Sequence, residues 1–165
     1  MAPDIDQELR VVLKALEQVI SPALDPADPS AAEQLRLCIA ALRHVQGHFA
    51  LALHCARREL ANAIDLAETV NAAAPTSGLD EAVRAAGEQL HDIRADQAAL
   101  DVARQILLAA ISEAVNGISE PSARRAVDRA VIAGSRSQLD LARAWFIEAG
   151  REPDPQAIPP LDSML

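Results

Sequence analysis

The chain is poor in aromatic residues, and its charge is strongly acidic. Only Phe49, Trp145 and Phe146 are aromatic among 165 residues, there is no tyrosine, and the formal net charge is −9. A negative surface repels phosphate backbones, and few aromatic rings are present on which bases could stack. The composition therefore argues against nucleic acid as a partner.

Glycine is scarce as well, with six residues in the whole chain. Few glycines leave little room for loops that cradle phosphates. No Gly-x-Ser-x-Gly element, phosphate-binding glycine loop or Cys-x-x-Cys pair occurs. The missing motifs favour a protein that is not an enzyme.

The two cysteines, Cys38 and Cys55, lie on one expected helix. At ~1.5 Å per residue they are roughly 25 Å apart, too far for an intrachain disulfide. The longest uncharged apolar run, residues 106–111, is too short to span a bilayer, and Met1 is followed by Ala-Pro-Asp rather than by a signal sequence. We therefore expect a cytoplasmic protein with reduced thiols and no membrane partner.

Proline is confined to the edges of four proline-free stretches. Proline lacks the donor that a helix interior needs, and its ring clashes with the preceding turn, so its absence over such lengths permits long helices. The ten residues are Pro3, Pro22, Pro26, Pro29, Pro75, Pro121, Pro153, Pro155, Pro159 and Pro160.

Between the prolines the apolar residues recur at helical spacing, and no period-2 run indicates a strand. We expect an all-α fold: a bundle of three long antiparallel helices, at about residues 30–71, 79–116 and 119–150, plus a shorter N-terminal helix. Ser30, with Glu33 three residues later, and Ser77 are the expected caps of the first two long helices. Residues 1–150 would form a single domain, followed by an extended proline-rich tail, 151–165.

Beside its main core stripe, the expected helix 30–71 carries a second apolar stripe. This helix would be roughly 60 Å long, too long for the N-terminal helix to cover entirely. The sequence therefore predicts association with a second copy of the chain, as a homodimer, or with another protein. The expected interface residues are Leu37, Leu51 and Leu66.

The same helix contains a candidate metal site at His44 and His48, which are four positions apart. Imidazole suits zinc or iron, and Cys55 and Glu59 continue the line, but one straight helix cannot close four ligands around one ion. Other helices would have to supply the remaining ligands. The alternative is that this line belongs to the apolar stripe and is covered by a helix or a partner subunit.

A Glu-x-x-His element on the expected helix 79–116 is half of a di-iron motif, formed by Glu88 and His91. Its second half is missing from the chain. A symmetric dimer would supply a second copy, and otherwise both are surface residues.

Polar residues also fall on expected inward faces, namely Gln97, Arg104 and Gln138, and Asp101 lies at the edge of such a face. A buried arginine is costly unless it is paired. Either Arg104 forms a structural salt bridge, with Asp101 or across helices, or the three residues line a pocket for a small anionic ligand.

Residues 8–24 and 33–37 resemble the opening of small uncharacterised bacterial helical proteins that are encoded beside acyl-CoA dehydrogenase and phosphotransferase-like genes. Residues 89–150 are similar in rhythm to the helical C-terminal domain of acyl-CoA dehydrogenases. The resemblance implies an accessory role near CoA-ester metabolism and transfers no functional residue.

Overall fold

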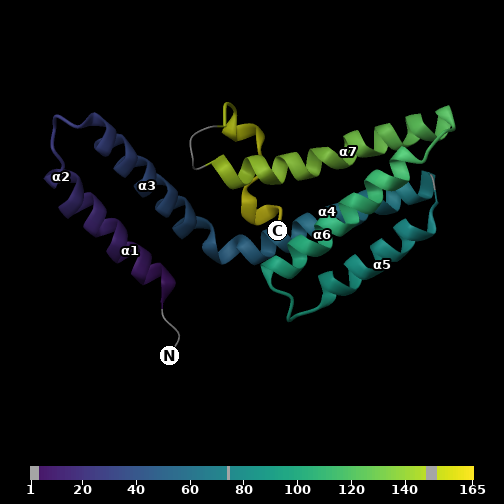
Figure 1. Cartoon of the computed structure of the whole chain (residues 1–165), viewed down its shortest axis with the longest axis horizontal. Coiled ribbons are helices and arrows are strands. Elements are labelled where there is room, and N and C mark those ends of the chain that lie inside the picture. Colours follow the sequence, from purple (N-terminus) through teal and green to yellow (C-terminus); the bar gives the residue numbers. More distant parts are fainter. Residues whose placement is uncertain (1–3, 74, 148–151) are drawn as a thin grey trace. The chain divides into compact units, whose positions relative to one another are not determined.

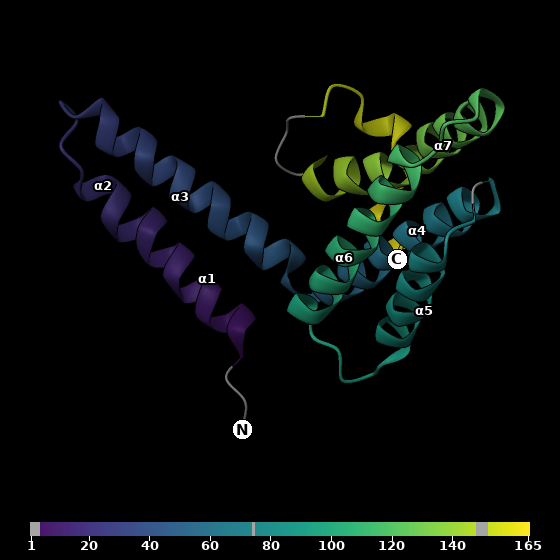
Figure 2. The same cartoon turned by 45° about the vertical axis from the view of Figure 1, so that its right-hand side comes forward.

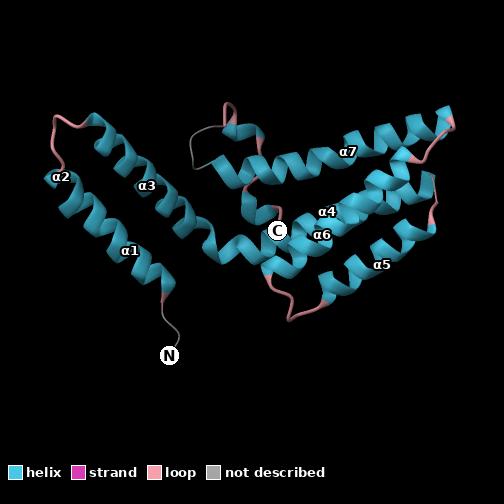
Figure 3. Ribbon diagram, in the orientation of Figure 1, coloured by secondary structure: helices cyan, strands magenta, loops and turns pink. Residues whose placement is uncertain are grey.

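The structure is a computed structural model that describes residues 4–73, 75–147 and 152–165. Within those ranges every regular element is helical and no strand occurs, which confirms the all-α class (Figures 1 and 3). None of the described helices combines the length and the apolar character needed to cross a membrane. The chain divides into two compact units, residues 1–50 with 148–151, and residues 51–147 with 152–165.

The first unit is a helical hairpin. Helix α1 (Ile5–Ala15) continues through a π-helical turn (Leu16–Ile20) into the short α2 (Ser21–Ala23). After a loop, α3 (Pro29–His48) runs back beside α1, as Figures 1 and 2 both show.

Two polar contacts join α1 to α3 in the hairpin. The side chain of Gln46 donates to Asp6 Oδ1 at 2.8 Å, and Arg43 Nη2 donates to Glu17 Oε1 at 2.6 Å. Hydrogen bonds from Gln46 and then Arg10 lower the pKa of the Asp6 carboxyl. These contacts fix which sides of the two helices face each other.

The described part of the second unit contains the helices α4 (Ala52–Ala73), α5 (Ser77–His91), α6 (Gln97–Asn116) and α7 (Pro121–Phe146). Helix α4 packs against each of the other three. The largest fully buried side chains of this core are Leu60, Val70, Leu79, Leu100, Leu107, Val127 and Leu141.

The single helix expected over 79–116 is wrong, because the chain turns between α5 and α6 at residues 92–96. Arg57 donates to the carbonyl oxygens of Leu90 and Asp92, which satisfies acceptors at the end of α5. The Asp96 carboxylate then caps α6 by accepting from the Ala99 amide at 2.8 Å. Ile93 lies in the turn and is 91 % exposed.

The helix expected over 30–71 is also divided. The α-helix is interrupted by the 3-10 turn Phe49–Leu51, which connects α3 to α4. The nearby Gly47 does not break the helix, because it lies inside α3. The described part of the chain therefore has shorter helices than the three expected. The single domain over residues 1–150 stays a prediction, and its boundary with the tail at 150–151 lies outside the described residues.

The helix caps lie just before the expected serines. Asp28 caps α3 by accepting from the Ser30 and Ala31 amides, with Pro29 as the first helical residue. Thr76 caps α5 by accepting from the Leu79 amide at 3.3 Å. Ser30 and Ser77 thus lie in the first turns of these helices.

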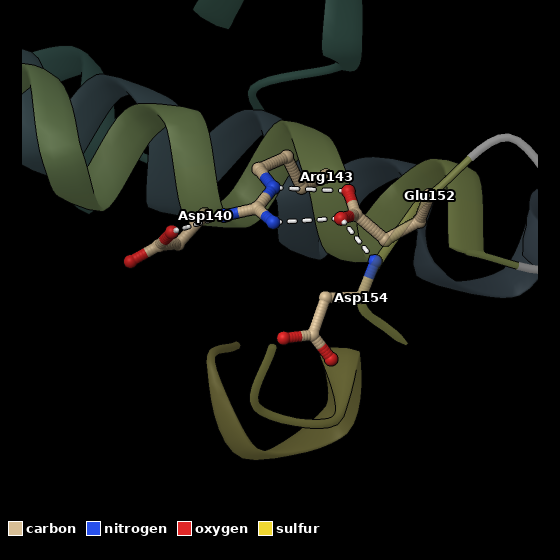
Figure 4. A network of polar contacts seen from close by, with 4 residues as sticks. All are labelled: Asp140, Arg143, Glu152 and Asp154. Atoms are coloured by element: carbon tan, nitrogen blue, oxygen red, sulfur yellow. Dashed lines mark hydrogen bonds and ion pairs between the residues drawn. The ribbon is translucent and has the colours of Figure 1, made fainter. Parts of the chain in front are cut away.

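The C-terminal segment is folded rather than extended. It contains the 3-10 turns Pro155–Ala157 and Leu161–Ser163, and Ile158 is buried. Glu152 anchors it to α7 with two hydrogen bonds from Arg143, at 2.9 and 2.6 Å, while Asp140 lies on the other side of the guanidinium (Figure 4).

We expect Glu152→Gln to loosen this segment. The bonds from Arg143 lower the pKa of the Glu152 carboxyl, so this interaction stabilises the fold above the unfolded-state pKa of roughly 4.3 and is lost as pH falls through the lower folded-state value. Thermal unfolding should show Glu152→Gln less stable than the wild type at pH 7, with the difference disappearing in acid. The exposed Glu81→Gln is the control and should match the wild type. A difference that persists in acid would contradict the prediction.

Two helical glycines offer a matched comparison of packing. A Cβ added at Gly87 meets no atom within 4 Å, whereas one at Gly134 lies 3.1 Å from Leu66 Cδ1. Gly87→Ala should raise the free energy of unfolding by about 0.5–1 kcal/mol, because alanine favours a helix. Gly134→Ala should gain less, since Leu66 must move. Equal gains in urea unfolding would show that α4 and α7 are not in close contact there.

Candidate functional site

The candidate site is a pocket of about 350 Å³ between α4, α6 and α7 of the second unit. Its polar side chains come from Glu59 on α4 and from Gln97, Asp101 and Arg104 on α6. Apolar walls complete it, formed by Ala52, Ala56, Leu141, Ala142, Trp145 and Phe146, together with Cys55.

Glu59 is the residue that connects the three helices. Its Oε2 lies 3.4 Å from Arg104 Nε, and its Oε1 accepts from Gln138 Nε2 at 3.2 Å. Asp101, one helical turn before Arg104, has its Oδ1 3.8 Å from Arg104 Nη2. All three charged side chains are about two-thirds or more buried.

The structure therefore brings two of the three predicted ligand-binding residues into one network. Arg104 and Gln138 both contact Glu59, while Gln97 is an exposed residue at the start of α6 whose side chain lines the pocket. The predicted pairing of Arg104 with Asp101 is present. The role of Glu59 was not foreseen, although its spacing from the buried Ala56 and Leu60 places it beside the core face of α4.

Among the described residues, Arg104 is held by these two long ion pairs. Its Nε is buried and makes no hydrogen bond to a described residue. Two carboxylates surround this one guanidinium, so the polar side of the pocket has a surplus of one negative charge. Of the two alternatives that the sequence left open, this charge balance favours the structural salt bridge over a pocket for an anionic ligand.

The Cys55 thiol lines the same pocket and stays protonated. Burial, and secondly the charge of Glu59, raise the pKa of Cys55 to about 11. Metal binding and nucleophilic attack both require the thiolate. At neutral pH Cys55 is therefore a small apolar wall residue, and both cysteines are free thiols as expected.

His44 and His48 lie against each other on α3, with ring centroids 4.3 Å apart. His48 Nδ1 donates to the His44 carbonyl oxygen at 2.8 Å, and His48 is buried. Among the described residues no group of three or more histidine, cysteine, aspartate or glutamate side chains is placed to hold a metal ion. The zinc or iron site that the sequence predicted at His44 and His48 therefore stays a prediction.

The Glu-x-x-His residues are exposed on α5 and bind locally. Glu88 Oε1 accepts from Arg84 at 2.6 Å, and His91 Nδ1 donates to the Gly87 carbonyl oxygen at 2.7 Å. This arrangement corresponds to the surface alternative.

The predicted interface residues do not form one stripe. Leu37 is exposed on α3, in the first unit. Leu51 and Leu66 are half-buried residues of the second unit, and Leu66 packs against its core beside Gly134. Leu66 is therefore used within the chain.

No protein-family model, curated protein or solved structure matches this chain. The resemblance to proteins encoded near acyl-CoA dehydrogenases, and the accessory role it implies, stay predictions. The function proposed below is therefore based on the residues of this chain alone.

We expect Arg104→Met to lower the melting temperature, because it leaves the half-buried Glu59 carboxylate without its counterion. The side chains retain some exposure, so the loss should be about 1 kcal/mol. Arg84→Met is the control: its ion pair with Glu88 is largely exposed, and the melting temperature should hardly change. If Arg104→Met has the same melting temperature as the wild type, the ion pair makes no net contribution to the stability of the fold.

Proposed function

We propose that the protein acts by association, as a homodimer formed through the hairpin of the first unit. The observation that carries the proposal is the poor core of this unit: Leu13 is its only buried apolar residue among those described. The exposed large apolar residues of the hairpin are Ile5, Val11, Val12, Val19, Ile20, Leu37, Val45 and Phe49.

A two-helix hairpin with so small a core gains little stability by itself. Isolated helices are marginal in water, and most helical stability comes from packing an apolar face. Fully burying a valine or isoleucine side chain contributes roughly 1.5–3 kcal/mol, and these residues are about half exposed. Covering several of them would therefore supply what the hairpin lacks.

Exposed apolar residues follow two rows at heptad spacing. Ile5 and Val12 are seven residues apart on α1, and Val19 follows seven residues later in the π-helical turn; Cys38 and Val45 are seven apart on α3. Heptad spacing is the pattern of packed helix pairs. We call these five residues the association face.

Both rows lie on the same side of the hairpin. Asp6 and Gln46 face each other across the two helices, and each directly follows a row residue, Ile5 or Val45. One residue turns a helix by roughly 100°. Ile5 and Val45 are each one residue before a contact residue, so each is rotated by this angle from the line that joins the two helices. Because the helices are antiparallel, the two rotations lead to the same side of the hairpin, and the two rows form one surface.

A second copy of the chain is the partner that this surface fits. Two such hairpins related by a two-fold axis form a four-helix bundle in which each apolar row packs on another. None of the five residues of the association face is itself charged, so the rows of two copies can pack on each other without burying a charge from either row.

The test is the mass in solution. Light scattering at micromolar concentration should give a dimer for the wild type, and Val12→Glu with Val45→Glu should give a monomer, since buried unpaired carboxylates are costly. Val102→Glu is the matched control, because this valine is similarly exposed on α6 but lies outside the face; it should remain dimeric.

Two results would contradict the proposal. A wild-type monomer throughout the micromolar range removes the association role. A dimer that survives both substitutions in the hairpin but dissociates in Val102→Glu places the interface on the second unit instead. Circular dichroism of each variant checks that the helices are retained.

A further inference from the structure

We propose that the pocket between α4, α6 and α7 binds a small organic cation, a protonated amine attached to an apolar, ring-sized body. This site lies entirely in the second unit and does not depend on the proposed dimer. Three properties of the pocket carry the inference: its charge, the acceptors it leaves open and its aromatic wall.

The charge balance selects the sign of the ligand. Glu59 and Asp101 oppose the single guanidinium of Arg104, and the remaining lining residues, with Cys55 protonated, are neutral. A carboxylate ligand would add a third negative charge to a partly desolvated site. An ammonium group would instead neutralise the surplus, which is the favourable direction in a site screened less than bulk water.

Asp101 is the open acceptor. Its carboxylate lies 3.8 Å from Arg104 Nη2 and accepts no hydrogen bond from the described residues, whereas Glu59 already accepts from Gln138. The side chain of Asp101 is 35 % exposed, so a ligand can reach it. An ammonium group has three donors for such an oxygen. Asp101 is therefore the anchor of the cation.

The other side of the pocket suits an apolar ring. Trp145 and Phe146 come from the end of α7 and line the pocket together with Leu141. Aromatic faces attract cations and also bury flat apolar groups. A volume of about 350 Å³ is that of a site for a small molecule.

Trp145 also provides the measurement, because it is the only tryptophan in a chain without tyrosine. Its fluorescence therefore reports on the pocket alone. Three probes of similar shape separate charge from apolar contact: phenethylamine as the cation, 2-phenylethanol as the neutral analogue and 3-phenylpropionate as the anion. Each is titrated into the full-length protein at pH 7 and low salt.

We expect saturable change in Trp145 fluorescence with phenethylamine, with a Kd on the order of millimolar for so small a ligand. The alcohol and the carboxylate should bind at least about 10-fold more weakly. Asp101→Asn should weaken amine binding by about 10-fold, and Asp101→Glu, which keeps the charge, should retain most of it. Asp128→Asn is the control, because this aspartate pairs with Arg124 on the surface of α7.

Arg104→Gln distinguishes a site for a cationic ligand from a site for an anionic ligand. If Asp101 anchors a cation, removing the competing guanidinium keeps or raises amine affinity. Tighter binding of 3-phenylpropionate than of phenethylamine, lost in Arg104→Gln, would overturn the inference in favour of an anion site. Amine binding that is unchanged in a folded Asp101→Asn, or an absence of any fluorescence change with the amine, would overturn it as well. A monomeric wild type that still binds the amine removes the dimer and leaves this site standing.

Discussion

Burial of one face of α4 is the constraint on which the second unit depends. Leu60, Ala67 and Val70 are completely buried there, and the same helix packs against α5, α6 and α7. Small residues on this face let the neighbouring helices approach closely. Because Glu59 directly precedes Leu60, its carboxylate is drawn to the margin of the core, and α6 and α7 must supply it with partners. The polar pocket is thus a consequence of how α4 is packed.

Local periodicity in the sequence predicted which segments are helical, but it could not predict contacts between residues that are distant in the sequence. The all-α class was predicted because apolar residues recur at the helical repeat that burial follows. The turn at residues 92–96 was missed because it contains neither proline nor glycine. The backbone carbonyl groups at its start accept hydrogen bonds from Arg57, which is more than thirty residues away in the sequence. The backbone amide of Ala99 just after its end donates to the capping carboxylate of Asp96. Asp92 and Asp96 were the only local signal.

The single stripe expected through Leu37, Leu51 and Leu66 is not present for a related reason, while their role in an interface stays a prediction. Placing the three residues on one stripe assumed a straight helix, whereas the 3-10 turn Phe49–Leu51 interrupts it. Such a turn has three residues per turn rather than 3.6, so the stripe loses its phase there. Most of the exposed large apolar residues of the first unit lie outside that stripe, on both helices of the hairpin. In the candidate pocket, Arg104 and Gln138 were predicted as candidates because each falls on the inward face of its helix. Their shared partner Glu59 could not be predicted in this way, because the contact depends on how three helices pack.

The pocket also breaks the rule by which buried charges are fully paired. Arg104 Nε lies buried without a hydrogen bond, and a second carboxylate stands beside a guanidinium that needs only one. Stability alone would favour apolar side chains at these positions, because desolvated charges with imperfect partners cost free energy. Natural proteins depart from local rules chiefly at functional sites. The hairpin shows the opposite departure, an apolar surface without a cover. In the two proposals above, a small charged ligand relieves the first departure and another apolar surface relieves the second, so a different kind of partner is proposed for each unit.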